Sequence, residues 1–256
     1  MGRSSHQTNS LIENNGTFLT KPVEIANYFN NYFVIKVDGL RKGLMPVDGT
    51  SSCTLIEKCM MKNKNCKFDF VQIAVPDINK LLLSLPIEKP AGTDNLDGKL
   101  LRLAAAYIST PICHIFNRCL TNGVCLRIWK EAKIIPIPKD SKSNFTGANS
   151  RPISILSVLS KLLENIVFNQ IQNYFIINNL ITSSQHRESH STTTALAQLT
   201  DDWLKHIDDR EIVGTVLLDF SAAFDVIYHN ILITKLDKYG FNRIALSWMI
   251  SYLSER

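Results

Sequence analysis

The chain has 256 residues, of which 45% are hydrophobic and 20% are charged, and its formal net charge is +5. These values are ordinary for a globular protein with a substantial core, and the mild excess of basic residues suits a polyanionic partner without identifying one. No apolar run approaches the roughly 20 residues that would cross a bilayer, and the N-terminus lacks the charged and then apolar pattern of a signal peptide, so neither feature is predicted.

Residues 1–66 are polar and rich in asparagine, and we interpret them as a linker or connector. One amphipathic helix is predicted inside this region, over Val23–Phe33, because apolar side chains recur there at helical spacing. Residues 67–128 are predicted to be a helical extension that precedes the next domain. In it Asp77 caps a short helix, and two further helices cover Lys99–Ser109 and the stretch that begins at Pro111 and ends at Asn122-Gly123.

Residues 129–256 alternate between strand and helix patterns. Trp129–Lys139 is predicted to be a strand with edge prolines, and a polar loop leads from it to a second strand that begins near Arg151. An amphipathic helix follows, with apolar positions at Leu156, Leu159, Leu163 and Ile166. A further helix over Thr192–Ile207 places Leu196, Leu199, Trp203 and Ile207 on one face, and two short helices are predicted on either side of Gly240.

The apolar run Ile212–Leu218 ends abruptly on Asp219. We predict a buried strand here, because a sheet fixes the backbone while the strand end delivers a carboxylate to solvent, which is how many enzymes place a metal ligand. The bland alternative is an acid at a strand end that caps a turn. Small and aromatic residues follow, and the segment closes on a second acid, Asp225.

The six cysteines form no Cys-x-x-Cys pair, and no histidine stands at zinc-finger spacing from them. We therefore expect an intracellular protein with reduced, buried thiols, located in the nucleus or the cytoplasm.

The string LLDFSAAFD, with HNILITKL after it, closely resembles the first catalytic-aspartate motif of the reverse transcriptases of non-LTR (LINE-type, Jockey-like) retrotransposons. Other blocks of the same family resemble this chain in the same order: NGTFLTKPVEIANYFNNYF, LPIEKPAGTDNL, WKEAKIIPIPK, RPISIL with SKLLENIV, QHRESHSTTTAL and LSWMISYLSER. The resemblance implies an α+β fold, the fingers and partial palm of a right-hand polymerase, truncated before the second catalytic motif and the thumb.

The resemblance also implies two-metal nucleotidyl transfer, with Mg²⁺ or Mn²⁺ as the cofactor. Asp219 is then a catalytic metal ligand, and the carbonyl of Phe220 is a second one. The implied nucleotide-binding residues are Lys139, Arg151, Ala222, Ala223 and Phe224, and the implied template-binding residues are Arg187 and His190. Taken without the resemblance, the two basic residues would be solvated side chains and Phe224 a core residue. We interpret Asp225 as structural, holding the turn into the next helix.

The chain departs from the family pattern in several places. It lacks Gly-Phe between His186 and Arg187, has Ser189 where a glycine is usual, and has Ser150 where a tyrosine is usual. The Pro-Gln-Gly block and the Ala-Asp-Asp hairpin have no counterpart. The acidic pairs Asp201-Asp202 and Asp208-Asp209 precede Asp219 and are expected on a solvated helix face, so they do not replace the missing carboxylates.

We therefore expect the 129–256 region to be the fingers and first part of the palm of a reverse transcriptase, whose partners are an RNA template, a DNA primer and dNTPs. The remainder of the polymerase and an endonuclease would belong to a full-length element. The chain by itself is expected to be inactive, since one carboxylate cannot organise two ions. Two alternatives stay open: a non-catalytic module that binds RNA or an RNA–DNA hybrid, and an unrelated α+β domain.

Overall fold

The computed structural model describes residues 12–14, 17–43, 54, 66–88, 90–140, 145–181, 191–219 and 222–255. These residues form helices and two small antiparallel sheets, a mixture compatible with the expected α+β class. In chain order the elements are β1 (Ile12–Asn14), β2 (Thr17–Leu19), α1 (Pro22–Gly43), α3 (Val75–Leu83), α4 (Gly98–Asn122), the 3₁₀ turn η2 (Arg127–Trp129), β3 (Ala132–Pro138), β4 (Ser150–Leu156), α5 (Val158–Ile177), α6 (Thr192–Asp208), α7 (His229–Lys238) and α8 (Arg243–Leu253). None of the described helices is long and apolar enough to cross a membrane.

Helix α4 is the centre of the main core. Its N-terminus is capped by Asp97, whose carboxylate accepts a hydrogen bond from the Leu100 amide at 2.7 Å, and its C-terminus ends on Gly123 in the left-handed conformation at φ 66°. The predicted C-cap is thus confirmed. The predicted break at Pro111 is wrong, because α4 continues through this proline as one helix.

Helix α4 stays continuous through Pro111 because its two halves bury the same apolar face. A proline inside a helix removes one backbone hydrogen bond and costs about 3 kcal/mol or more. Buried side chains on both sides of it offset that cost: Leu101, Ala105, Ile112, Phe116 and Leu120. The carbonyl that Pro111 cannot bond belongs to Tyr107, an exposed residue at which water can take the place of the missing donor.

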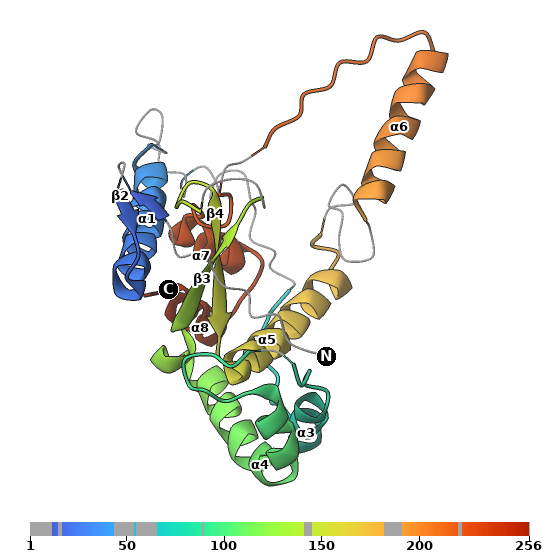
Figure 1. Ribbon diagram of the computed structural model, residues 1–256. Helices are drawn as coiled ribbons and strands as arrows, with labels where there is room; N and C mark the ends of the chain where they lie inside the picture. The colour runs from blue at the N-terminus through green and yellow to red at the C-terminus, as the bar shows by residue number, and fades with distance from the viewer. Residues whose placement is uncertain are drawn as a thin grey trace, which may run out of the picture.

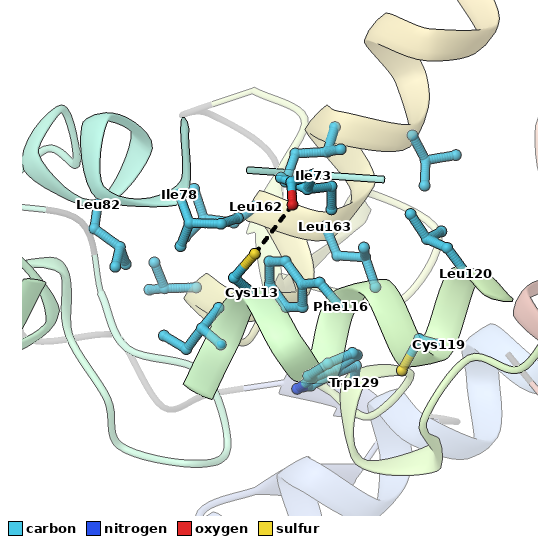
Figure 2. Packing of buried hydrophobic residues seen from close by; sticks show 14 of the residues in the cluster. Ile73, Ile78, Leu82, Cys113, Phe116, Cys119, Leu120, Trp129, Leu162 and Leu163 are labelled. Carbon is cyan, nitrogen blue, oxygen red and sulfur yellow. Dashed lines mark hydrogen bonds between the residues drawn. The ribbon is translucent and has the colours of Figure 1, made fainter. Parts of the chain in front are cut away.

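Helices α3, α5 and α8 contribute side chains to the core beside α4. Figure 2 shows this packing for α3, α4 and α5. Phe116 is fully buried, and its ring meets Trp129 edge-on at 5.4 Å between centroids. The segment before α3 is held by Asn117, whose side-chain amide accepts a hydrogen bond from the Ile73 N–H at 2.8 Å and donates one to the Ile73 carbonyl at 2.9 Å. The same carbonyl accepts a hydrogen bond from the Cys113 thiol at 3.1 Å. Helix α3 begins after Ala74, so Asp77 lies inside its first turn and the prediction that it caps the helix is wrong.

Three described cysteines are buried as expected, Cys113, Cys119 and Cys125, whereas Cys66 is only half-buried. Burial raises the pKa of the Cys119 thiol to about 11, with a smaller contribution from the neighbouring Cys125. The Cys119 thiol is therefore neutral at physiological pH.

A second, smaller cluster joins α7 and α8 to the segment before α3. The Phe68 amide donates to the Gly240 carbonyl at 2.9 Å, and the Asn242 amide donates to the Phe68 carbonyl at 3.0 Å. Gly240 has φ 89°, and a Cβ there would lie 2.1 Å from the Cys66 carbonyl oxygen, so this turn requires glycine.

Strands β3 and β4 form the expected hairpin, paired from Ala132 opposite Leu156 to Pro138 opposite Ser150. Pro136 stands directly opposite Pro152. Leu156 belongs to the end of β4, whereas the sequence pattern had placed it in the following helix. That helix, α5, begins after Ser157, whose hydroxyl accepts a hydrogen bond from the Ser160 amide at 3.0 Å.

The predicted helix over Thr192–Ile207 is confirmed as α6, but α6 buries none of its described side chains. Figure 1 shows α6 standing apart from the rest, joined to it by an extended segment, residues 211–219. The prediction of a buried strand in this segment is wrong: Ile212, Val216 and Leu217 are largely exposed, and no strand is assigned there. A strand needs a neighbour for its backbone groups, and no other described segment pairs with this one.

Helix α1 extends past the predicted Phe33 to Gly43, and β1 pairs with β2 just before it. The 1–66 region therefore contains more regular structure than a linker.

We expect Phe116→Ala to lower the free energy of unfolding by about 3–5 kcal/mol, because it removes a fully buried ring and leaves a cavity. Leu103→Ala on the same helix is the matched control, since that side chain is 74% exposed and its loss should change stability by less than about 0.5 kcal/mol. Urea unfolding followed by circular dichroism measures both, and equal losses would contradict the assignment of this core.

Candidate nucleotide site

The β3–β4 hairpin brings Lys139 and Arg151 to the same end and the same face of a two-stranded ribbon. They are 151 − 139 = 12 residues apart in sequence. Arg151 pairs with Ile137, and the Lys139 amide continues the ladder by donating to the Asn149 carbonyl at 2.7 Å. Side chains alternate between the faces of a strand, so Lys139, two residues after Ile137, shares the face of Arg151. Both side chains are exposed.

Residues 146–150 form a compact turn beside Lys139. The Ser150 hydroxyl, in a residue only 1% exposed, donates to the Thr146 carbonyl at 2.7 Å, and the Ser150 amide donates to the Gly147 carbonyl at 3.3 Å. The Lys139 ammonium donates to the Ala148 carbonyl at 2.6 Å. An ammonium has three donors, so this bond fixes the side chain and leaves donors for an anion.

The residues after the extended segment form a tight turn. Asp219 is exposed at the end of the segment, and Ala222 has φ 53°, in the left-handed region. The Asp225 amide donates to the Ala222 carbonyl at 2.9 Å, so the Asp225 backbone takes part in the turn. The Phe224 side chain is 89% exposed and lies outside any core, in contrast to the alternative of a buried ring.

The structure assembles only part of the predicted site. Phe220, Arg187 and His190 lie outside the described residues. Within the described residues no hydrogen bond or ion pair joins Asp219 to Lys139 or Arg151, and no group of three or more acidic, histidine or cysteine side chains could hold a metal ion. Of the predicted metal ligands the described residues include Asp219 alone, and they do not complete a donor set for the expected divalent metal. The four aspartates of the two acidic pairs are exposed, on α6 and at its end.

Sequence reasoning missed three residues of α1 that contact the segments of this site: Tyr28, Tyr32 and Arg41. The only available signal was the aromatic density of the string NYFNNYF, which we interpreted as the apolar face of an ordinary helix.

Curated relatives match most of the chain. It is 32% identical over 186 residues, 72% of its length, to a protein described as a probable RNA-directed DNA polymerase from transposon BS of Drosophila melanogaster. It is 27% identical over 208 residues, 80% of its length, to the RNA-directed DNA polymerase from mobile element jockey of the same species. The chain is homologous to non-LTR retrotransposon polymerases.

A third relative, the probable RNA-directed DNA polymerase from transposon X-element of Drosophila melanogaster, is 29% identical over 86% of the chain. The chain spans only between a fifth and a quarter of the length of these relatives: 20% of the BS polymerase, 23% of the jockey polymerase and 24% of the X-element polymerase. No protein-family model matches the chain. The curated relatives thus confirm the resemblance to non-LTR retrotransposon polymerases that the sequence motifs indicated.

Ser150 is buried and its hydroxyl is bonded to the turn, so we expect Ser150→Ala to loosen the Lys139 end of the hairpin. Loss of this hydrogen bond should cost about 1 kcal/mol and speed hydrogen exchange of the Lys139 amide. Ser154→Ala is the control, because Ser154 is exposed on the same strand. Exchange measured by NMR tests this, and equal rates in the two variants would argue against it.

Proposed function

We propose that this chain supplies the fingers and the first part of the palm of a LINE-type reverse transcriptase, an enzyme that copies an RNA template from a DNA primer with dNTPs. The observation that carries the proposal is the shared ribbon face of Lys139 and Arg151, in a chain homologous to RNA-directed DNA polymerases. A point charge and a planar guanidinium that project from one face can bind the same triphosphate.

In this proposal each predicted residue contacts a particular part of the nucleotide or the template. Lys139 and Arg151 contact phosphate oxygens, and the backbone amides of Ala222 and Ala223 face the same triphosphate, which small side chains permit. The exposed ring of Phe224 lies beneath the incoming sugar and rejects a 2′-hydroxyl by steric conflict. Arg187 and His190 contact the template.

Asp219 is the first metal-binding carboxylate in this proposal, with the Phe220 carbonyl beside it. Mg²⁺ prefers oxygen ligands, and a pair of such ions, held by these groups together with further carboxylates, would supply positive charge at the primer hydroxyl and at the departing pyrophosphate. The sequence contains no Ala-Asp-Asp string to complete the set. We therefore expect this polypeptide to bind substrates but not to polymerise alone, with further parts of the element supplying the remaining carboxylates and an endonuclease. Its place of action would be the nucleus or the cytoplasm.

The proposal is tested by titrating the protein with a fluorescently labelled dATP at low salt. Lys139→Ala and Arg151→Ala should each weaken binding about tenfold, because each removes a charge-assisted hydrogen bond worth about 1.5 kcal/mol. Lys133→Ala is the matched control: it is exposed on the same strand, and six residues at about 3.3 Å each place it about 20 Å from Lys139.

Equal weakening by all three variants would indicate non-specific attraction and contradict the assigned site. Primer extension on an RNA template by this polypeptide alone would contradict the expected inactivity. Salt-dependent binding of an RNA–DNA hybrid without any binding of dATP would favour the non-catalytic alternative.

A further inference from the structure

Aromatic side chains of α1 contact residues 145–147, in the turn that precedes Arg151. The Gly147 amide donates a hydrogen bond to the Tyr28 hydroxyl at 3.2 Å. Phe29, which is 3% exposed, packs against Phe145 with ring centroids 5.0 Å apart. The turn is therefore held both by a backbone hydrogen bond and by an aromatic contact from outside the hairpin.

Tyr32 completes this contact and explains why residue 147 is glycine. A Cβ at Gly147 would lie 2.5–2.7 Å from atoms of the Tyr32 ring, a distance that real Cβ atoms do not show. The affected atoms belong to the rigid ring, whose retreat requires movement of the whole side chain. Gly147 is not among the residues with positive φ, so the close approach of the ring, and not backbone strain, accounts for the glycine.

The same helix contacts the segment that follows Asp219. Near its C-terminus the Arg41 guanidinium donates a hydrogen bond to the backbone carbonyl of Asp225 at 3.1 Å. That carbonyl belongs to the turn that begins at Ala222. Nine residues separate Arg41 from Tyr32, a distance of about 14 Å at 1.5 Å per helical residue. One rigid helix therefore touches two segments that lie far apart in the sequence.

We propose that α1 is a positioning element that sets the distance between the hairpin turn carrying Lys139 and Arg151 and the turn at 222–226. This inference rests on the proposed function, in which both segments contact one triphosphate. Tyr28, Tyr32 and Arg41 act as positioning residues, because they hold the backbone of substrate-binding segments without touching substrate. A helix suits this role, since it keeps its length while loops do not, and sites need geometry fixed to within about 0.5 Å.

The test is a double-mutant cycle between Gly147 and Tyr32. Gly147→Ala should push the turn off α1, accelerate hydrogen–deuterium exchange in the peptide covering 145–151, and weaken binding of labelled dATP roughly fivefold or more, since small misplacements are costly in such sites. Adding Tyr32→Ala makes room for the new methyl group, so the double variant should bind no worse than Tyr32→Ala alone. Affinity for an RNA–DNA hybrid should stay unchanged throughout, which separates positioning from general loss of structure.

Gly39→Ala is the matched control on the same helix, because nothing lies within 4 Å of a Cβ there. At the other end of α1, Arg41→Ala should accelerate exchange in the peptide covering 222–228, and Arg41→Lys should restore part of the protection by supplying a donor to the Asp225 carbonyl.

The two measurements separate the failure of this inference from the failure of the proposed function. If Gly147→Ala and Arg41→Ala leave exchange in both peptides at wild-type rates, α1 positions neither segment and the inference is overturned. If exchange responds as expected but wild-type protein does not bind dATP, the proposed function falls, and α1 holds the two segments for a purpose other than nucleotide binding.

Discussion

The burial of one face of α4 is the interaction on which the remaining structure depends. Side chains of α3, α5 and α8 pack in the same cluster as the apolar side chains of this helix. In that cluster the ring of Phe116 contacts Trp129. This burial is also strong enough to carry the helix through Pro111. The smaller cluster joins α5, α7 and α8 on its own, whereas α3 is tied to the other helices through the face of α4.

Contacts with that core hold the two ends of the β3–β4 hairpin in place. Trp129 is buried three residues before β3 begins, and its carbonyl accepts a hydrogen bond from the Ser160 hydroxyl at 2.8 Å. At the other end Leu156, the last residue of β4, and Val158, the first residue of α5, are both buried. The ribbon is thus tied to the core at both strands, and residues 145–147 of its turn contact α1. The ribbon is therefore held by the core at its base and by α1 at its turn, while Lys139 and Arg151 stay exposed to solvent.

Local signals allowed most of the helices and the hairpin to be predicted from sequence. Gly123 and Gly240 mark helix ends because they adopt positive φ, and alternating apolar residues with edge prolines mark β3. The prediction of a buried strand failed because a strand needs a neighbouring strand to pair with, and a local pattern does not show whether one is present. The segment up to Asp219 has the composition of a buried strand but finds no neighbour among the described residues, so its apolar side chains remain exposed.

The candidate site follows the same rule. The convergence of Lys139 and Arg151 is a consequence of hairpin register, and a sequence pattern can predict it. The contacts of Tyr28, Tyr32 and Arg41 are tertiary, between residues as far as 184 positions apart, and no local pattern encodes them. The sequence predicted that α6 has an apolar face, but amphipathic spacing alone does not say what covers such a face, and α6 buries none of its described side chains.

The facing prolines of the hairpin have a consequence for how the ribbon meets other chains. Hydrogen-bonded and non-bonded pairs alternate along an antiparallel ladder, and the bonded pair at Lys139 and Asn149 places Pro136 and Pro152 in a non-bonded pair, where amides point outward. Each outer edge of the ribbon therefore lacks an N–H donor at the level of this proline pair. The hydrogen bonds between β3 and β4 are unaffected, because a non-bonded pair contributes none to them. A foreign strand that approached either side would meet a gap in the row of amides, so the ribbon resists edge-to-edge aggregation and stays two strands wide.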